Sequence, residues 1–196
     1  SPRQQNLLDA LLPHLEVPET DAGELDPRGL FDALLDETRL APAPSAGFSP
    51  EEIWLEIGFG GAEHLIEQAK RHPDVGFIGC EPYINGMAKI LAQIESRQLS
   101  NLRLFCGDAA ELIAWLPAAS LTRIDLIHPD PWPKRRHWKR RFVQDRMIEA
   151  MARVLRPGGE FRFVSDIDDY CAWTLAHFSH AHEFIWTAER ADDFRR

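Results

Sequence analysis

A short apolar segment that runs into a glycine-rich turn constrains the fold of this chain more than any other feature. Residues 53–57 read Ile-Trp-Leu-Glu-Ile, and Gly58, Gly60 and Gly61 follow directly. A near-continuous apolar run of this length is typical of a buried parallel strand. From Glu63 onward, apolar residues recur at helical spacing. Strand, glycine turn and helix in this order predict the start of a nucleotide-binding α/β fold.

The residues around the turn favour a ligand without phosphate. Glu63 stands where the dinucleotide-binding pattern G-x-G-x-x-G has its third glycine. Glu56 and Glu63 flank the turn and would repel a pyrophosphate at the helix N-terminus. S-adenosylmethionine carries a sulfonium and an ammonium, which carboxylates attract, so we expect it to contact Glu56, Gly58 and Gly60. The alternative for Glu56 is a structural carboxylate bonded to nearby backbone. We favour the cofactor contact, because a charge in a buried strand is costly unless it is paired.

Two further acidic residues follow predicted strands. Glu81 ends the second strand, 23 residues beyond Gly58. In doubly wound folds an acid at this distance accepts the ribose hydroxyls of an adenosine moiety. Asp108, with Ala109 beside it, follows the third strand, where it would accept the adenine amino group. Asp108 is also a favoured residue for capping the next helix, and the two roles are compatible.

A proline-rich loop follows the fourth predicted strand. Pro129, Pro131 and Pro133 restrict its backbone at the end of the sheet where open α/β folds bind ligands. Between the prolines, Trp132 offers a stacking surface and Asp130 a polar contact for a planar base. The alternative is a proline-rich turn whose Trp132 fills the core.

Six of the eight residues from 134 to 141 are basic, although the whole chain has a formal net charge of −9. Positive charge is therefore concentrated directly after the proline loop. We expect a helix from about Lys139 to Leu155, and cations at a helix N-terminus oppose its dipole. A solvated surface is the usual explanation of such a run, but this unfavourable position favours binding to a phosphate backbone.

Composition narrows the remaining classes. The chain has 196 residues, 44% of them hydrophobic, which suffices for one domain with a sizeable core. Cys80, Cys106 and Cys171 are widely spaced, so we expect a reducing compartment and no metal site. No apolar run reaches the roughly 20 residues of a membrane span and no signal peptide opens the sequence, so we expect a cytoplasmic protein. Monomer and homodimer both remain open.

Strands and helices alternate along most of the chain, which predicts a doubly wound, mostly parallel sheet with the glycine turn at its centre. We expect residues 1–52 to form a helix at 4–15 and an irregular, partly mobile lead-in with a short helix at 30–35. Residues 53–196 are expected to form the α/β domain. The expected strands are 53–57, 75–81, 101–106, 123–127, 160–164 and 183–187, and the expected helices begin at 63 and cover 85–94, 109–116, 139–155 and 168–178.

Six of these segments resemble successive motifs of the bacterial tRNA (guanine-N7-)-methyltransferases, the TrmB family. The resemblance covers roughly residues 54–196 and is most specific at the Pro-Asp-Pro-Trp-Pro-Lys motif with its basic follower. It implies a Rossmann-like class I methyltransferase fold, S-adenosylmethionine as cofactor and a guanine in the variable loop of tRNA as substrate. The matching segments are 55–61, 79–82, 107–109, 129–134, 139–141 and 165–166.

The resemblance also implies roles for single residues. Glu56, Glu81 and Asp108 match cofactor-binding positions, and Asp130 matches the catalytic, cofactor-proximal position. The positions that match substrate binding or the RNA-contacting segment are Lys134, Arg136, Lys139, Arg140, Arg141 and Asp166.

This sequence departs from the family pattern at three places. His128 stands where an aromatic residue is usual, and Ser165 where threonine is usual. The family continues beyond the region of residues 192–194 to a Thr-Arg/Lys-Tyr/Phe-Glu motif and a last strand. We expect that strand to be missing from this sheet, and methylation to suffer more than cofactor binding.

The chemistry of the implied reaction agrees with the residues present. Guanine N7 carries a lone pair and no proton, so its methylation depends on positioning and electrostatics rather than on a general base. Asp130 would orient the base or offset its developing positive charge. Two other classes remain open, an RNA-binding protein with a vestigial cofactor pocket and a nicotinamide-dependent oxidoreductase.

Overall fold

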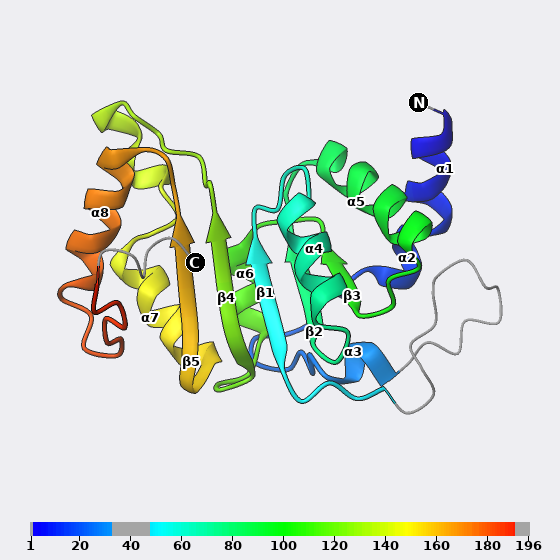
Figure 1. Cartoon of the computed structure of the whole chain (residues 1–196), viewed down its shortest axis with the longest axis horizontal. Coiled ribbons are helices and arrows are strands. Elements are labelled where there is room, and N and C mark those ends of the chain that lie inside the picture. The colour runs from blue at the N-terminus through cyan, green and yellow to red at the C-terminus, as the bar shows by residue number, and fades with distance from the viewer. Residues whose placement is uncertain (1, 33–47, 191–196) are drawn as a thin grey trace.

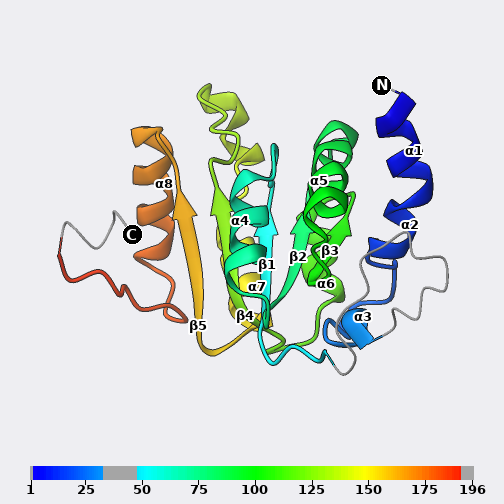
Figure 2. The same cartoon turned by 45° about the vertical axis from the view of Figure 1, so that its right-hand side comes forward.

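The computed structural model describes residues 2–32 and 48–190, which form a parallel five-stranded sheet between two layers of helices (Figures 1 and 2). The strands are β1 (Ile53–Ile57), β2 (Gly76–Cys80), β3 (Leu102–Phe105), β4 (Leu121–Ile127) and β5 (Leu155–Val164). Their order is β3-β2-β1-β4-β5, and every neighbouring pair is parallel. The predicted Rossmann-like sheet is thus confirmed, with β1 at its centre, where the order of the strands reverses.

The helices cover both faces of the sheet. Alternate side chains of a strand point to opposite faces, so Ile53, Leu55 and Ile57 pack with α6, α7 and α8, while Trp54 packs with α4 and α5. No helix in the described ranges is long and apolar enough to cross a membrane. The helices are α1 (Pro2–Ala10), α2 (Leu12–Leu15), α3 (Gly29–Asp32), α4 (Glu63–Arg71), α5 (Ile84–Arg97), α6 (Ala109–Trp115), the 3-10 helix η1 (Arg135–Arg140), α7 (Asp145–Val154) and α8 (Asp168–Phe178).

The amino-terminal segment is fastened to the β3 edge of the sheet. The backbone N–H of Val17 donates to the Leu104 carbonyl at 2.8 Å, and Nε of Arg103 donates to the Leu30 carbonyl at 2.8 Å. The expected helix at 4–15 is divided into α1 and α2. Of the helix expected at 30–35, α3 covers the start, and residues 33–35 lie outside the described part. The domain boundary after residue 52 stays a prediction.

The prediction of a helix from Lys139 to Leu155 is wrong at its start. The basic run forms the 3-10 helix η1, and α7 begins only at Asp145. Between them, Arg141 has extended backbone with ψ at 135°, and both Arg141 and Val143 are buried. A continuous helix is incompatible with that extended backbone. The cations of the basic run therefore do not stand at the N-terminus of α7 and do not oppose its dipole.

The predicted sixth strand at 183–187 is also wrong. No described residue forms a backbone bridge with this segment, and a strand requires such a hydrogen-bonded neighbour. Its β-prone residues Ile185 and Trp186 are 86% and 61% exposed. Phe184 instead packs edge-on against Phe178 at 5.1 Å between ring centroids. Residues 192–194, where the sequence points to continuation of the family pattern, lie outside the described part.

Candidate functional site

The carboxyl ends of the five parallel strands meet at one edge of the sheet, and this edge gathers most of the expected site residues. Glu81 directly follows β2, Asp108 follows β3, Asp130 follows β4 and Asp166 follows β5. Ligands of open α/β sheets bind at this edge, next to the point where the strand order reverses. Cavities of about 450 and 530 Å³ lie elsewhere, beside the amino-terminal segment and between α7 and α8.

The glycine turn leaves β1 with its backbone open to a ligand. Gly58 and Gly60 have φ values of 70° and 51°, a left-handed conformation that side chains disfavour. A Cβ atom built on either glycine meets nothing within 4 Å. The N–H of Gly60 donates to Oε2 of Glu81 at 3.0 Å, and the N–H of Tyr83 donates to Oε1 at 3.0 Å. The turn and the Glu81 carboxylate therefore hold each other in place.

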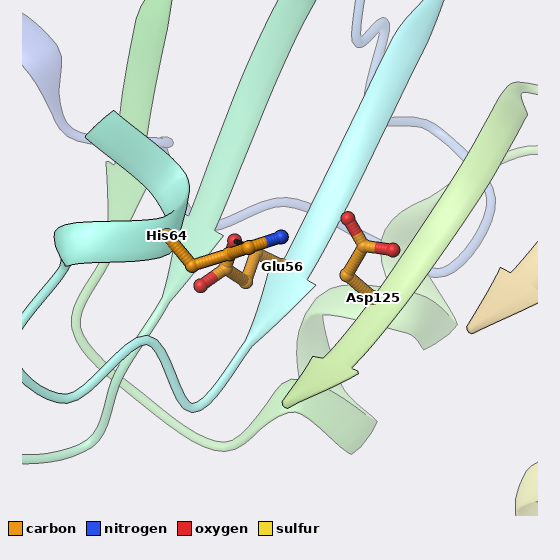
Figure 3. Close-up of side chains that lie close together, drawn as sticks. All are labelled: Glu56, His64 and Asp125. Atoms are coloured by element: carbon orange, nitrogen blue, oxygen red, sulfur yellow. Dashed lines mark hydrogen bonds and ion pairs between the residues drawn. The ribbon is translucent and has the colours of Figure 1, made fainter. Parts of the chain in front are cut away.

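Glu56 finds its partner in a residue that the sequence analysis did not single out. Oε2 of Glu56 lies 2.6 Å from Nδ1 of His64, at the start of α4 (Figure 3). Asp125 is the register partner of Glu56 on neighbouring β4 and accepts from Nε of Arg123 at 2.8 Å. Glu56 and Asp125 are buried, at 4% and 3% exposure. The alternative considered for Glu56, a carboxylate bonded to nearby backbone, therefore named the wrong partner, because the carboxylate bonds the His64 side chain.

The Glu56–His64 contact changes the acidity of both groups. Burial raises the pKa of Glu56, and the hydrogen bond with His64 offsets only part of that rise. The same hydrogen bond raises the pKa of His64, against the opposing effect of burial. The pair therefore retains a proton to higher pH than either side chain would in water.

Glu56, His64 and Asp125 are the one group among the described residues whose histidine and carboxylate atoms all lie within 4.8 Å of one another. Such a set could in principle hold a metal ion. One atom of each residue is already engaged, because Nδ1 of His64 bonds Oε2 of Glu56 and Nε of Arg123 bonds Oδ1 of Asp125. The cluster fits an internal hydrogen-bond network better than a metal site.

A sequence signal for this cluster did exist. Arg123 and Asp125 interrupt the apolar strand β4 as Glu56 interrupts β1. Charged residues inside buried strands must be paired, because an isolated buried charge is costly. What the sequence did not indicate was which of these charges face one another, or that His64 joins them.

Asp108 has the capping role that the sequence allowed. Its Oδ1 accepts from the N–H of Ala110 at 2.8 Å, at the start of α6. Asp108 is exposed, whereas Ala109 is buried. A cap made through one carboxylate oxygen is compatible with a ligand bond to the other, so the adenine contact stays a prediction.

The proline loop presents Asp130 to solvent and holds Trp132 half-buried. The Trp132 ring contacts His137 edge-on at 5.8 Å, and the Arg140 guanidinium lies 4.8 Å from its centroid. Trp132 thus packs against the basic segment, residues 134–141. The alternative that Trp132 fills the core is wrong. His128 lies 3.5 Å from Asp166, which joins the ends of β4 and β5.

The basic segment presents five cations to solvent and hides a sixth. Its exposed members are Lys134, Arg135, Arg136, Lys139 and Arg140. Arg141 is only 2% exposed. Its Nε donates to the Pro131 carbonyl at 2.8 Å, and its Nη2 is paired with Asp169. The charged group of Arg141 faces the interior, so this arrangement does not support the expected contact with tRNA, which stays a prediction.

The proteins to which this chain is similar in sequence are methyltransferases. Residues 50–193 match the model of a family described as "Putative methyltransferase". The chain is 62% identical over 193 residues to the tRNA (guanine-N(7)-)-methyltransferase of Bradyrhizobium diazoefficiens, covering 98% of the chain and 75% of that relative. It is 68% identical over 173 residues to the protein of the same name from Rhodopseudomonas palustris strain BisB18, covering 88% and 68%.

A solved structure resembles the fold. The 16S rRNA methyltransferase KamB aligns with a TM-score of 0.50 at 18% identity, over 67% of this chain and 69% of that one. At this identity the likeness concerns the arrangement of strands and helices alone.

Proposed function

The chain belongs to the tRNA (guanine-N(7)-)-methyltransferase family, and on that premise we propose that it transfers a methyl group from S-adenosylmethionine to N7 of a guanine in the variable loop of tRNA. One observation carries the proposal. An open glycine turn braced by a buried carboxylate, a rigid loop with an exposed carboxylate, and five exposed cations all stand at the same edge of the sheet. Because the proposed substrate is tRNA, the proposal includes a cytoplasmic location.

On the cofactor side, the donors and acceptors present suit an adenosine with a cationic sulfur. Glu81 is already oriented by two backbone N–H groups, and each of its oxygens has a further lone pair for a ribose hydroxyl. Gly58 and Gly60 allow close approach of backbone to ligand. Asp108 accepts the adenine amino group, and Glu56, bonded to His64, lies directly before the turn. When bound, S-adenosylmethionine supplies an electrophilic methyl group.

On the substrate side, no residue has to remove a proton. Guanine N7 attacks with its lone pair, and the base becomes cationic as the methyl group is transferred. Asp130 holds the base and offsets this developing charge, which is electrostatic stabilisation rather than general-base catalysis. Lys134 and Asp166 hold the nucleotide from the two sides of the loop. Asp166 lies 3.5 Å from His128, which directly precedes the proline loop. This proximity supports joint action of Asp166 and Asp130 on the base.

Phosphates of the tRNA bind the exposed cations of the basic segment. Arg136, Lys139 and Arg140 are exposed in η1, and Lys134 precedes them. Interactions of this kind supply affinity and orientation without reading the base sequence. Their place beside the proline loop supports delivery of a splayed-out guanine to Asp130.

The decisive experiment incubates the protein with radiolabelled S-adenosylmethionine and an unmodified tRNA transcript, and then maps the methyl group. A matched transcript that carries 7-deazaguanine in the variable loop has no N7 atom and should accept no label there. Binding of tRNA and cofactor without transfer would favour the RNA-binding alternative. Titration with a nicotinamide cofactor tests the oxidoreductase alternative, for which binding would have to be observed.

A further inference from the structure

We propose that Arg141 is a positioning residue that holds the proline loop in the shape needed for methyl transfer. The inference rests on the proposed function, because it explains how Asp130 and Trp132 of that loop are kept in place. Arg141 belongs by sequence to the basic segment, yet its guanidinium is buried while the cations beside it are exposed.

The guanidinium joins the loop to helix α8. Nε donates to the carbonyl of Pro131 at 2.8 Å, and Nη2 is paired with the carboxylate of Asp169. The Arg141 side chain is fully buried, whereas that of Asp169 is 58% exposed. A single planar group thus makes one hydrogen bond to the loop through Nε and one charge-assisted bond to the helix through Nη2. The rigid fork of an arginine holds two such donors apart in fixed directions, whereas a lysine would have to make both bonds from one nitrogen.

Three aromatic rings enclose the same group. The guanidinium carbon lies 5.1 Å from the ring centre of Trp138, 5.0 Å from Tyr170 and 5.1 Å from Trp173. Nη1 of Arg141 is buried and has no hydrogen-bond partner among the described residues. Burying a charged group with one unpaired donor costs free energy of desolvation, and an apolar side chain of similar volume would fill the space without that cost. We therefore infer that an arginine is needed here for its two directed bonds, to the Pro131 carbonyl and to the Asp169 carboxylate.

The bonded carbonyl lies next to a strained residue. Trp132 has a φ of 43° and His128 a φ of 48°, in the left-handed region that residues other than glycine rarely adopt. Such strain persists only where the surroundings enforce it, and it is concentrated at functional sites. The hydrogen bond from Arg141 holds the peptide that joins Pro131 to Trp132, and Asp130 directly precedes Pro131. Arg141 therefore acts on the backbone of both site residues.

Other contacts anchor the chain around Arg141 without its side chain. Nε1 of Trp173 donates to the Val143 carbonyl at 2.7 Å, and the Val143 N–H donates to the Tyr170 hydroxyl at 3.4 Å. Nε2 of Gln144 donates to the Arg141 carbonyl at 3.2 Å. The two bonds of Val143 hold this segment against α8 in a variant, and the bond of Gln144 keeps its local shape. Loss of the guanidinium should therefore release the proline loop while the rest of the fold stays intact.

The test compares Arg141→Lys with Arg146→Lys, a matched change at an exposed arginine of α7. With cofactor and tRNA both saturating, we expect the single-turnover methylation rate of Arg141→Lys to fall on the order of a hundredfold, because small misplacements of a reacting group have such effects. Cofactor affinity and the salt dependence of tRNA binding should match wild type. Arg146→Lys should behave as wild type throughout.

A second readout does not depend on activity. In Arg141→Lys, trypsin should cut faster after Lys134, Arg135 and Arg136 than in wild type or in Arg146→Lys, because the loop before them is released. Asp169→Asn keeps a hydrogen-bond acceptor and changes a half-exposed residue, so it folds even if Arg141→Lys does not. We expect it to show the same two effects to a smaller degree.

Several results would overturn the proposal. One is a normal single-turnover rate in a folded Arg141→Lys protein. Another is a defect that disappears at saturating tRNA together with a shallower salt dependence, which would make Arg141 a phosphate-binding residue after all. Unchanged proteolysis of both variants would show that the loop is held by other bonds. If wild-type protein fails to methylate tRNA at N7, the proposed function fails, and the proteolysis result still decides the positioning role.

Discussion

His64 Nδ1 lies 2.6 Å from Glu56 Oε2, and the two residues bracket the glycine turn in the sequence. Glu56 belongs to β1 and His64 to the first turn of α4, so the hydrogen bond ties strand to helix across the turn. Because the turn also forms part of the proposed cofactor site, the protonation of this pair links the stability of the fold to the site.

Stability should fall as pH rises through the titration of this pair. The folded-state pKa of His64 is raised above 6.5 by Glu56, so its stabilising contribution is complete below pH 6.5 and is lost above the raised pKa. The pKa of Glu56 is raised above 4.5 by burial, which also favours the fold at lower pH. Urea unfolding midpoints should therefore decrease as the pH rises above 6.5 and through the raised pKa of His64.

The His64→Gln variant isolates this contribution. Its unfolding midpoint should be lower than that of wild type below pH 6.5 and should change less as the pH rises, because the titrating imidazole is gone. His182→Gln, at an exposed histidine, should keep the wild-type profile. Parallel profiles for wild type and His64→Gln would contradict the assignment.

Cofactor affinity should depend on Glu81. Glu81→Ala removes the proposed bonds to the ribose and also the acceptors of the Gly60 and Tyr83 N–H groups. Bonds to charged groups contribute roughly 1.5–3 kcal/mol each, so calorimetry should show a loss of affinity well beyond tenfold. Glu67→Ala, which removes an exposed carboxylate of α4, is the control and should leave binding unchanged. Wild-type affinity in Glu81→Ala would remove this residue from the site.

Binding of tRNA should depend on the exposed cations and not on their buried neighbour. Replacing Lys139 and Arg140 together by alanine should reduce the slope of log affinity against log salt by about 2, one for each phosphate that is no longer neutralised. Lys70 and Arg97 lie at the far ends of α4 and α5, and their double alanine variant should keep the wild-type slope. An unaltered slope for Lys139 and Arg140 would make the basic segment a solvated surface.

Asn101 should be important for stability although it lies far from the site. It is buried, and its Nδ2 lies 3.0 Å from each of the carbonyls of Ala69, His72 and Val75, which close the end of α4. Asn101→Ala removes a donor from the buried carbonyls of Ala69 and Val75, whereas the His72 carbonyl still accepts from the Val75 N–H, and we expect a cost of about 1–3 kcal/mol. Urea denaturation should register this loss, and Asn6→Ala on the exposed side of α1 should not change stability comparably.

The sequence by itself determined the order and type of most elements. Apolar runs bounded by glycine and proline predicted all five strands of the observed sheet, and the helix predicted at 168–178 has the observed bounds. These features are local, because a buried parallel strand and an amphipathic helix each leave their own period in the chain. The convergence of Glu81, Asp108 and Asp130 followed as well, since parallel strands end at one edge.

Only the tertiary structure decided which charged side chains are exposed to solvent and which are buried. Arg140 and Arg141 are adjacent and chemically identical, yet Arg141 is buried because Tyr170 and Trp173 from α8, far along the chain, enclose it. The partner of Glu56 likewise depends on how β1, α4 and β4 pack. The predicted strand at 183–187 had suitable residues but no neighbour to pair with among the described residues. Partners distant in sequence leave no local pattern, so burial, pairing and sheet membership emerged only when the chain was folded.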